Sequence, residues 1–241
     1  MKIGLLGNGR MGRTIEKLAV ERGHTIAVIF EKETPLTPDS RLNGAEVLID
    51  FSTAEAVPDN LNAAARLGIP VVEGTTGWTH QLGEMTKIDG LTVLYSPNFS
   101  FGVYVFLKAS GILSRMINSI GNYDAYIHEW HHAAKADSPS GTAKMLAGIL
   151  LSNLSPKEHP LFETSHGRIA PEALHVTSTR VGSLPGTHEA GFNSPFDLLT
   201  IRHQSTGREG FAYGALRAAE WLADRNGIFT MDDFMQDILA I

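Results

Sequence analysis

The middle of the chain carries residues whose types and spacing could transfer protons beside a bound anion. His131, His132 and Lys135 lie within five consecutive positions and can concentrate positive charge and movable protons. The residues 140–143, Ser-Gly-Thr-Ala, read as the first turn of a helix, where unpaired backbone N–H groups favour an anion. Cations that face such N–H groups predict a receptacle for a carboxylate or a phosphate.

Two other interpretations of this segment are open. It could be a polar loop with surface histidines, although the nearby lysine and the predicted anion-binding turn favour a site over that reading. It could also bind a metal ion. Adjacent histidines on a strand point to opposite faces, and no cysteine or HExxH pattern accompanies them, so the sequence disfavours a metal site and none is predicted.

The residues on either side predict the elements that position these groups. Alternation over 123–132 predicts a strand that places Glu129 and His131 on the same face. Pro139 and the residues after it are typical of a helix start. Lys135 therefore belongs to a loop that leaves the end of a strand and enters a helix.

The first residues of the chain form a second motif with chemical meaning. A short apolar strand, Lys2–Leu6, runs into Gly7-Asn-Gly-Arg-Met-Gly12, and a helix and a second strand, Thr25–Phe30, follow. In this pattern the first glycine allows a tight turn, the second lets the backbone approach a pyrophosphate, and the third lets the helix pack against the strand. The motif predicts dinucleotide binding, and a glycine-rich turn with only a packing role is the alternative.

The end of the second strand bears on which dinucleotide binds. Glu31 stands where an acidic residue is expected about 20 residues after the glycines, and its carboxylate can bind the ribose 2′-hydroxyl of NADH. Lys32 could instead pair with the 2′-phosphate of NADPH, or it could be a solvated surface lysine. The sequence therefore predicts use of NADH, NADPH or both.

The strand–helix rhythm continues to Tyr95, including a helix expected over 79–89, and predicts a doubly wound parallel sheet. Two further strands end in loops, Gly74–Gly77 and Ser96–Ser100, at the edge where ligands of such sheets bind, although these residues could have only turn and core roles. The residues predicted to contact the cofactor are Gly7, Asn8, Gly9, Arg10, Met11, Gly12, Glu31, Lys32, Thr75, Thr76, Gly77, Ser96, Pro97, Asn98 and Phe99.

The pattern changes in the second half of the chain. Three successive strands, over 173–181, 187–192 and 197–203, predict a mixed or antiparallel sheet in a second domain. The expected fold class is thus α/β, a dinucleotide-binding domain with a smaller α+β substrate domain. The expected division places residues 1–102 and 209–241 in the dinucleotide-binding domain and 103–208 in the substrate-binding and oligomerisation domain, with helices over 103–118, 210–226 and 231–241.

Composition excludes several classes of protein. The 241 residues are 43% hydrophobic, which is normal for a globular chain with a core. A net charge of −6 and the lack of a long basic run argue against nucleic-acid binding. The chain has no cysteine for disulfides, no apolar run of the roughly 18 residues that span a membrane, and no signal-like start. A cytoplasmic protein without nucleic-acid or membrane partners is expected.

The fifteen residues 129–143 resemble the signature of one enzyme family. Their sequence, E-W-H-H-A-A-K-A-D-S-P-S-G-T-A, is similar throughout to the pattern E-x-H-H-x-x-K-x-D-x-P-S-G-T-A of the 4-hydroxy-tetrahydrodipicolinate reductases, also called dihydrodipicolinate reductases. The cofactor segments match in order, and Arg180–Gly182 and Gly186–Glu189 are similar to the family's substrate-domain strands. This chain departs from the family's pattern at two places. Its loop over 33–43 is short, and only one residue separates the first two glycines of the glycine motif.

The resemblance implies an NAD(P)H-dependent oxidoreductase of lysine and diaminopimelate biosynthesis. Its substrate is a cyclic imine with two carboxylates, to which nicotinamide supplies a hydride and a neighbouring acid supplies a proton. The resemblance implies His131 and Lys135 as the acid–base pair, and which of them protonates the ring is open. It also implies a homotetramer built through the second domain's sheet. The residues implied to bind the substrate are His132, Ser140, Gly141 and Thr142.

The glycine motif alone allows two rival functions. One is a different two-domain dehydrogenase that acts on an amino acid or its semialdehyde. The other is a non-catalytic dinucleotide sensor, which would not need His131 and Lys135 beside an anion-binding turn. Binding of NADH followed by pyridine-2,6-dicarboxylate distinguishes the reductase from both.

Overall fold

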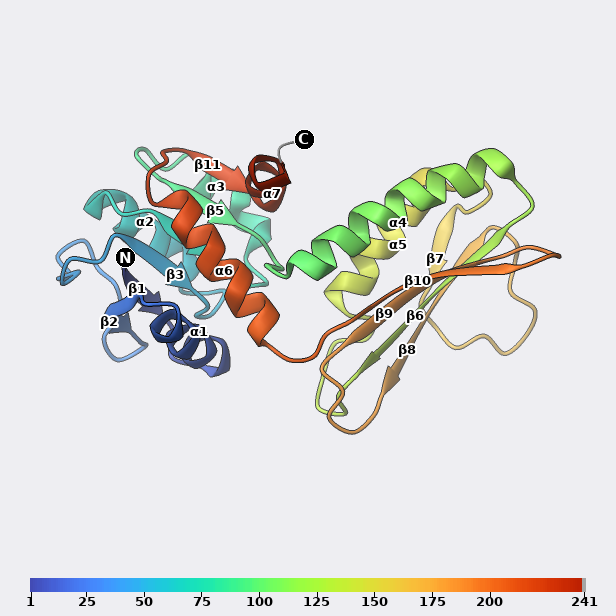
Figure 1. The fold of residues 1–241 in the computed structure, drawn as a ribbon, viewed down its shortest axis with the longest axis horizontal. Helices are drawn as coiled ribbons and strands as arrows, with labels where there is room; N and C mark the ends of the chain where they lie inside the picture. Colours follow the sequence, from blue (N-terminus) through green and yellow to red (C-terminus); the bar gives the residue numbers. More distant parts are fainter. Residues whose placement is uncertain (240–241) are drawn as a thin grey trace. The chain divides into compact units, whose positions relative to one another are not determined.

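The computed structural model describes residues 1–239, which fold into two compact units. One unit comprises Met1–Ser100 together with the segment that begins at Arg208, and the other comprises Phe101–Gly207. The chain therefore leaves the first unit once and returns to it near its end, as the colours of Figure 1 show.

The first unit is built on a six-stranded parallel sheet with the order β11-β5-β4-β3-β1-β2. The chain order changes direction between β1 and β3, and the carboxyl ends of such neighbouring strands are where ligands of open α/β sheets bind. The strands are β1 (Lys2–Leu6), β2 (Thr25–Phe30), β3 (Val47–Asp50), β4 (Val71–Glu73), β5 (Val93–Tyr95) and β11 (Ile228–Thr230).

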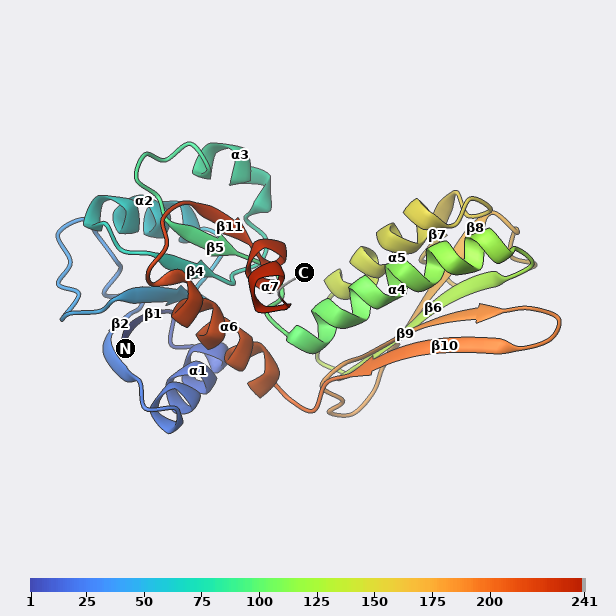
Figure 2. The same ribbon diagram turned by 45° about the horizontal axis from the view of Figure 1, so that its top comes forward.

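Helices cover both faces of this sheet (Figure 2). On one face α6 packs against α1 and against β3 and β4, and its alanines and Gly214 are buried. On the other face α2 packs over an apolar cluster that includes Leu6, Leu48, Val71 and Val93. The helices are α1 (Arg10–Glu21), α2 (Val57–Leu67), the 3-10 turn η1 (Thr79–Gln81), α3 (Leu82–Met85), α6 (Glu209–Leu222) and α7 (Met231–Leu239).

The second unit is a five-stranded mixed sheet with the order β10-β9-β6-β8-β7. The central strand β6 is antiparallel to β9 and parallel to β8. Two helices, α4 (Phe101–Ile120) and α5 (Gly141–Asn153), cover one face and enclose an apolar core with Ile127, Val176 and Phe192 (Figure 1). The strands are β6 (Asp124–His131), β7 (His159–Leu161), β8 (Ala173–Arg180), β9 (Thr187–Asn193) and β10 (Leu198–Gln204).

The predicted fold class is confirmed, and three local predictions need correction. The helix expected over 79–89 is only η1 and the single turn α3, because Gly83 and the threonine, isoleucine and aspartate that follow have weak helix propensity. The edge strands β7 and β11 were missed because three residues show no periodicity. The helix expected over 210–226 ends at Leu222, and the last two residues of the helix expected over 231–241 lie outside the described residues.

Among residues 1–239, no helix is both long enough and apolar enough to cross a membrane.

Candidate active site

The strand β6 sorts its side chains by alternation, as the sequence predicts. Its burial pattern alternates along its length, and Glu129 and His131 both point to the buried face. Glu129 is fully buried at 0% exposure, and His131 retains 8%. A carboxylate that is removed from water in this way requires partners, because an isolated buried charge is strongly unfavourable.

One oxygen of the Glu129 carboxylate receives three hydrogen bonds. The Ser140 backbone N–H donates to Oε1 over 3.0 Å, and the Ser178 hydroxyl donates to it over 2.8 Å. The Arg180 guanidinium donates to the same oxygen over 2.8 Å and forms an ion pair with it. These donors come from the N-cap of α5 and from β8, so Glu129 joins the start of a helix to the neighbouring strand.

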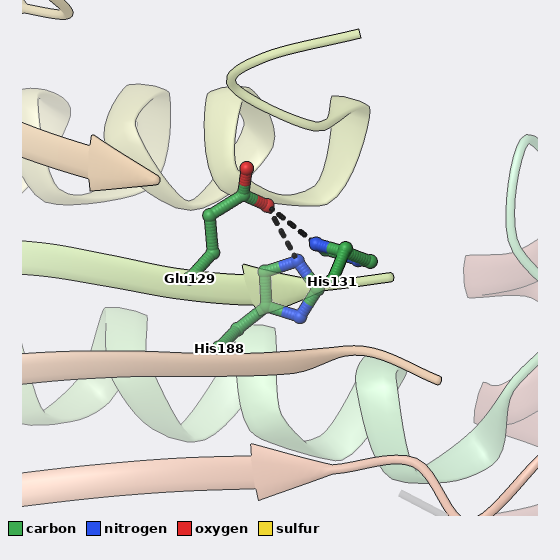
Figure 3. A group of neighbouring side chains, drawn as sticks. All are labelled: Glu129, His131 and His188. Carbon is green, nitrogen blue, oxygen red and sulfur yellow. Dashed lines mark ion pairs between the residues drawn. The ribbon is translucent and has the colours of Figure 1, made fainter. Parts of the chain in front are cut away.

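The other carboxylate oxygen faces two imidazole rings (Figure 3). Oε2 lies 3.2 Å from His131 Nδ1 and 3.4 Å from His188 Nε2. Burial by itself would raise the pKa of Glu129, but the hydrogen bonds from His131, His188, Ser140 and Arg180 together hold that pKa far below its usual range. Glu129 is therefore an anion in the folded protein, and its Oε2 is the negatively charged atom that both rings face.

The contact with Glu129 fixes how the His131 ring presents its nitrogens. With Nδ1 directed at a carboxylate, the proton on that nitrogen is favoured and Nε2 is the free position for proton exchange. Gly186 lies beside Nε2, and a Cβ atom at this position would come within 3.0 Å of it. The absence of a side chain at Gly186, whose φ is +141°, leaves room beside this nitrogen.

The loop that follows β6 holds Lys135 beside a carboxylate. Lys135 Nζ lies 2.7 Å from Asp137 Oδ1, and 24% of the lysine side chain is exposed. Burial would raise the pKa of Asp137, but its hydrogen bond and charge interaction with Lys135 lower it. Arg180, which donates to Glu129, also donates to the Asp137 carbonyl over 2.6 Å and so ties this loop to the buried network.

The predicted helix start is present and Ser140 is its N-cap. The Ser140 hydroxyl accepts from the Ala143 N–H over 3.2 Å and lies 3.0 Å from His188 Nε2. Because its N–H donates to Glu129, both polar groups of Ser140 are used within the protein. Gly141 is exposed and Thr142 is half-buried, so the first turn of α5 is reachable from solvent at these two positions.

The same buried side chains could also be considered as metal ligands. Glu129, His131 and His188 offer ligand atoms within 4.8 Å of one another. However, the Arg180 guanidinium and two further donors already occupy the other oxygen of the same carboxylate. A cation so close to a guanidinium would be repelled, so the donor set favours a hydrogen-bonded carboxylate over a metal centre.

The glycine motif in the first unit forms a backbone cradle. Gly7 has a φ of +91°, and a Cβ there would lie 2.7 Å from the Phe51 carbonyl oxygen; a Cβ at Gly12 would lie 2.1 Å from the Gly7 oxygen. Gly9 faces open space and is the N-cap of α1, with no side chain capping the helix. The N–H groups of the first turn of α1 are thus free to bind an anion.

Comparison with known proteins identifies the family. Models for the N-terminal and C-terminal parts of dihydrodipicolinate reductase match residues 1–99 and 102–235. This chain belongs to the dihydrodipicolinate reductase family. A 4-hydroxy-tetrahydrodipicolinate reductase of Christiangramia forsetii is 39% identical over 99% of both chains, and one of Archaeoglobus fulgidus is 37% identical over 95% of this chain and 96% of its own.

A solved structure of the family has the same fold. A dipicolinate-bound dihydrodipicolinate reductase from Paenisporosarcina sp. TG-14 aligns with a TM-score of 0.73 and 20% identity over 95% of this chain and 97% of its own. An engineered D-amino acid dehydrogenase bound to NADP+ aligns with a TM-score of 0.52 and 13% identity over 100% of this chain and 98% of its own, which shows a shared fold alone. The predicted family resemblance is therefore confirmed.

The structure places the other predicted cofactor residues at the carboxyl ends of the first unit's strands. Thr76 and Gly77 are exposed in the loop after β4, while Thr75 is buried. In the loop after β5, residues 96–99, the Ser96 hydroxyl donates to the Asn98 carbonyl over 2.8 Å, and the ring of Phe99 is 1% exposed in the core. The residues predicted to contact the cofactor are therefore of two kinds: some are exposed, and others are buried and support the exposed loops.

Glu31 and Lys32 lie in a tight turn directly after β2. The backbone groups of Glu31 and Thr34 bond to each other over 3.2 and 3.1 Å, which closes the turn. Both Glu31 and Lys32 are exposed, so each is free to contact a cofactor ribose or its phosphate.

Sequence reasoning assigned no role in the site to Ser178, Arg180 and His188, although the last two lie in segments similar to the family's substrate-domain strands. They reach Glu129 from β8 and β9, about fifty positions farther along the chain. A signal was available in β8, since Ser178 and Arg180 alternate in phase with the buried Leu174 and Val176. Polar residues that continue the buried face of a strand require a buried partner, and Glu129 is that partner.

Proposed function

We propose that this chain reduces 4-hydroxy-tetrahydrodipicolinate, a cyclic imine dicarboxylate, to tetrahydrodipicolinate with NADH or NADPH, as a step of lysine and diaminopimelate biosynthesis. Membership of the reductase family supports this activity. The single structural observation that carries it is the buried Glu129 carboxylate, which orients His131 next to the Lys135 loop and the start of α5.

The first unit fits a dinucleotide. The open backbone at Gly9 and the uncapped first turn of α1 form a cradle for a pyrophosphate, and the exposed Glu31 and Lys32 can reach the adenosine ribose. When bound, NADH or NADPH supplies the hydride of the reduction.

The second unit fits the substrate's negative charges. The N–H groups of Gly141 and Thr142 at the start of α5 can bind one carboxylate, assisted by the positive end of the helix dipole. His132, which is half-buried directly after β6, can bind another. Ser140 acts indirectly in this scheme, because its N–H and hydroxyl hold α5 against Glu129 and His188.

The acid–base groups complete the reaction. Hydride addition to a ring carbon conjugated with the C=N bond requires a proton at the neighbouring position, and His131 and Lys135 are the donors proposed for it. Glu129 faces His131 Nδ1 and so orients that ring, and Asp137 holds the Lys135 ammonium. Positive charge near the ring nitrogen also stabilises the charge that develops during reduction.

Loss of NADH absorbance tests the activity when the purified chain is coupled to the synthase that makes the substrate. Turnover that depends on the synthase and is inhibited by pyridine-2,6-dicarboxylate is the expected result. NADH binding without turnover would favour a dinucleotide sensor. Turnover only with an amino acid or a semialdehyde would favour another dehydrogenase.

A first prediction concerns the choice of cofactor. Because Glu31 suits NADH and Lys32 suits NADPH, we expect kcat/KM values for the two cofactors within about tenfold of each other. Lys32→Ala should weaken NADPH by several-fold to about tenfold and leave NADH nearly unchanged, since it removes one charge-assisted contact. Lys87→Ala, at another exposed lysine of the same unit, is the control for steady-state kinetics. A thousandfold preference of the native chain for either cofactor would contradict this prediction.

The second unit also supports assembly through its sheet, and we propose a homotetramer built on it. The helices α4 and α5 cover one face, and within the described residues no helix covers the other (Figures 1 and 2). The uncovered face carries half-buried rings: the Tyr126 hydroxyl donates to Glu189 over 2.7 Å, and Trp130 lies against His128 and under Arg202. Burial and Glu189 raise the pKa of Tyr126 to about 12, so its hydroxyl stays protonated.

A second prediction tests this assembly. Trp130→Glu should convert a tetramer into smaller species in sedimentation velocity, because it places a charge in the centre of the proposed interface. Ile112→Glu is the matched control, since it puts the same charge at an exposed apolar position of α4. A native monomer, or an unchanged tetramer of the Trp130 variant, would count against assembly through this face.

A further inference from the structure

Two carboxyl groups are buried side by side in the first unit. Asp50 ends β3 and Glu73 ends β4, and the two residues are paired in the parallel register of these strands. Asp50 has 0% exposure and Glu73 has 1%. Neither belongs to the glycine cradle or to the acid–base site, and the reaction described above does not use them.

The hydrogen bonds around the pair are distributed unequally. The Ser52 N–H donates to Asp50 Oδ1 over 2.8 Å, the Asn60 amide to Oδ2 over 2.8 Å, and the Thr75 hydroxyl to Oδ1 over 3.3 Å. Glu73 receives one bond, from the Thr75 N–H to Oε1 over 2.6 Å, and its Oε2 has no hydrogen-bond partner. The hydrogen bonds around Asp50 therefore stabilise its anionic form, whereas Glu73 has too few donors for its own carboxylate to be stabilised in the same way.

Polar but uncharged groups surround the pair in the part of the chain that the structure describes. The polar groups that face it are Ser52, Thr75, Asn60 of α2 and Tyr95, the register neighbour of Glu73 on β5. Within residues 1–239, neither carboxyl forms an ion pair with a lysine, arginine or histidine. Two negative charges in contact inside a protein repel strongly, and such pairs hold a proton between them.

Burial and charge act in the same direction on Glu73. Burial raises the pKa of Glu73 well above its usual range, and the Asp50 charge raises it further. Burial also raises the pKa of Asp50, while hydrogen bonds from Ser52 and Asn60 oppose that effect. The two directions agree with the geometry, in which the partnerless Oε2 of Glu73 is the atom left to carry a proton.

The pair also holds the loop that follows β4. Thr75 bonds to Glu73 through its N–H and to Asp50 through its hydroxyl, and the Gly74 N–H donates to the Asp50 carbonyl over 2.9 Å. The Thr75 carbonyl in turn accepts from the Trp78 indole over 2.9 Å. Thr75, within the 74–77 loop, is thus fixed to two strand ends through these carboxyl groups.

We propose that Asp50 and Glu73 share a single proton, carried by Glu73, and that this singly charged pair positions the 74–77 loop for binding of NADH or NADPH. Asp50 and Glu73 are positioning residues in this scheme, which rests on the proposed function. Loss of the shared proton at alkaline pH places two negative charges at the ends of adjacent strands. The resulting repulsion separates the groups that hold Thr75, and cofactor binding weakens.

The test is a titration of the protein with NADH, monitored by fluorescence and repeated from about pH 6 to about pH 9.5. The dissociation constant of the native chain should rise about tenfold through an alkaline transition, which corresponds to the loss of one or two hydrogen bonds in the loop. Glu73→Gln should abolish this transition, because its amide can donate to Asp50 and accept from Thr75 but cannot ionise. Glu84→Gln, at an exposed position of α3, should keep it.

Infrared spectroscopy of the native chain provides a second measurement that does not depend on a variant folding. The C=O stretch of a protonated carboxyl should be present at neutral pH, disappear through the same alkaline transition and be missing in Glu73→Gln. Absence of this band in the native chain, or NADH binding without an alkaline transition, would overturn the inference alone. Failure of the native chain to bind NADH at any pH would overturn the proposed function and this inference together.

Discussion

Replacing Lys135 with alanine is expected to lower kcat by about 10²–10⁴-fold, the contribution of a positioned proton donor. The structure holds the Lys135 ammonium 2.7 Å from Asp137 on a loop that Arg180 ties to Glu129, so the charge is presented at a defined place. NADH affinity should hardly change, because the glycine cradle belongs to the other unit. Saturation kinetics together with an NADH titration measure the two effects separately.

The arginine variant distinguishes proton transfer from simple binding of a carboxylate. If Lys135 is a proton donor, Lys135→Arg stays as slow as the alanine variant, because a guanidinium does not release its proton at accessible pH. Lys144→Ala, at an exposed position of α5, is the matched control and should behave like the native chain. Thr142→Ala should instead raise KM more than it lowers kcat, as expected for uniform binding. A fully active Lys135→Arg variant would rule out Lys135 as the donor.

Replacing Glu129 with glutamine is expected to damage both stability and catalysis. The carboxylate accepts from Ser140, Ser178 and Arg180 and faces two rings, so the change leaves the buried guanidinium without its counter-ion. Breaking a buried ion pair in this way costs about 3–5 kcal/mol, or a fall in Tm of roughly 10 °C for a chain of this size. The kcat should fall by about 10–100-fold or more, because an amide N–H does not accept from His131 Nδ1 and the ring loses its orientation.

Thermal unfolding and steady-state kinetics measure these effects, and Glu189→Gln is the matched control. Glu189 lies on the other face of the same sheet and bonds to the Tyr126 hydroxyl, so its replacement should cost less than about 1 kcal/mol. Equal losses of stability and of kcat in the two variants would mean that the hydrogen bonds and ion pairs of Glu129 contribute no more than an ordinary surface carboxylate.

The same network sets an expected dependence of stability on pH. Burial lowers the pKa of His188, so the folded ring resists the proton that the unfolded ring takes up below about pH 6.5, and stability falls as the pH drops below that value. Glu129 has a folded pKa far below its usual range, so its contribution is present above about pH 4.5 and is lost only as the pH falls further. The Glu129→Gln variant should not show the second loss of stability, which occurs below about pH 4.5 in the native chain.

The sequence by itself determined the parts of this protein that depend on local periodicity and on contiguous motifs. The glycines between a strand and a helix, and the alternation that buries Glu129 with His131, are short-range patterns, and the structure contains both. The family signature over 129–143 is also contiguous, and the family and the fold class it implied are confirmed. The edge strands β7 and β11 escaped this reasoning because three residues show no period, and the helix expected over 79–89 is only η1 and the single turn α3.

Only the tertiary structure decided which distant residues meet. Arg180 reaches Glu129 because β8 pairs with β6 in one register, and a shift of one residue would turn its side chain to the opposite face. Asp50 and Glu73 end two apolar strands that are more than twenty residues apart in the sequence, and only the pairing of β3 with β4 brings them side by side. Strand register is set by packing of the whole sheet, so the charges that neutralise or repel one another inside this protein become visible only once it is folded.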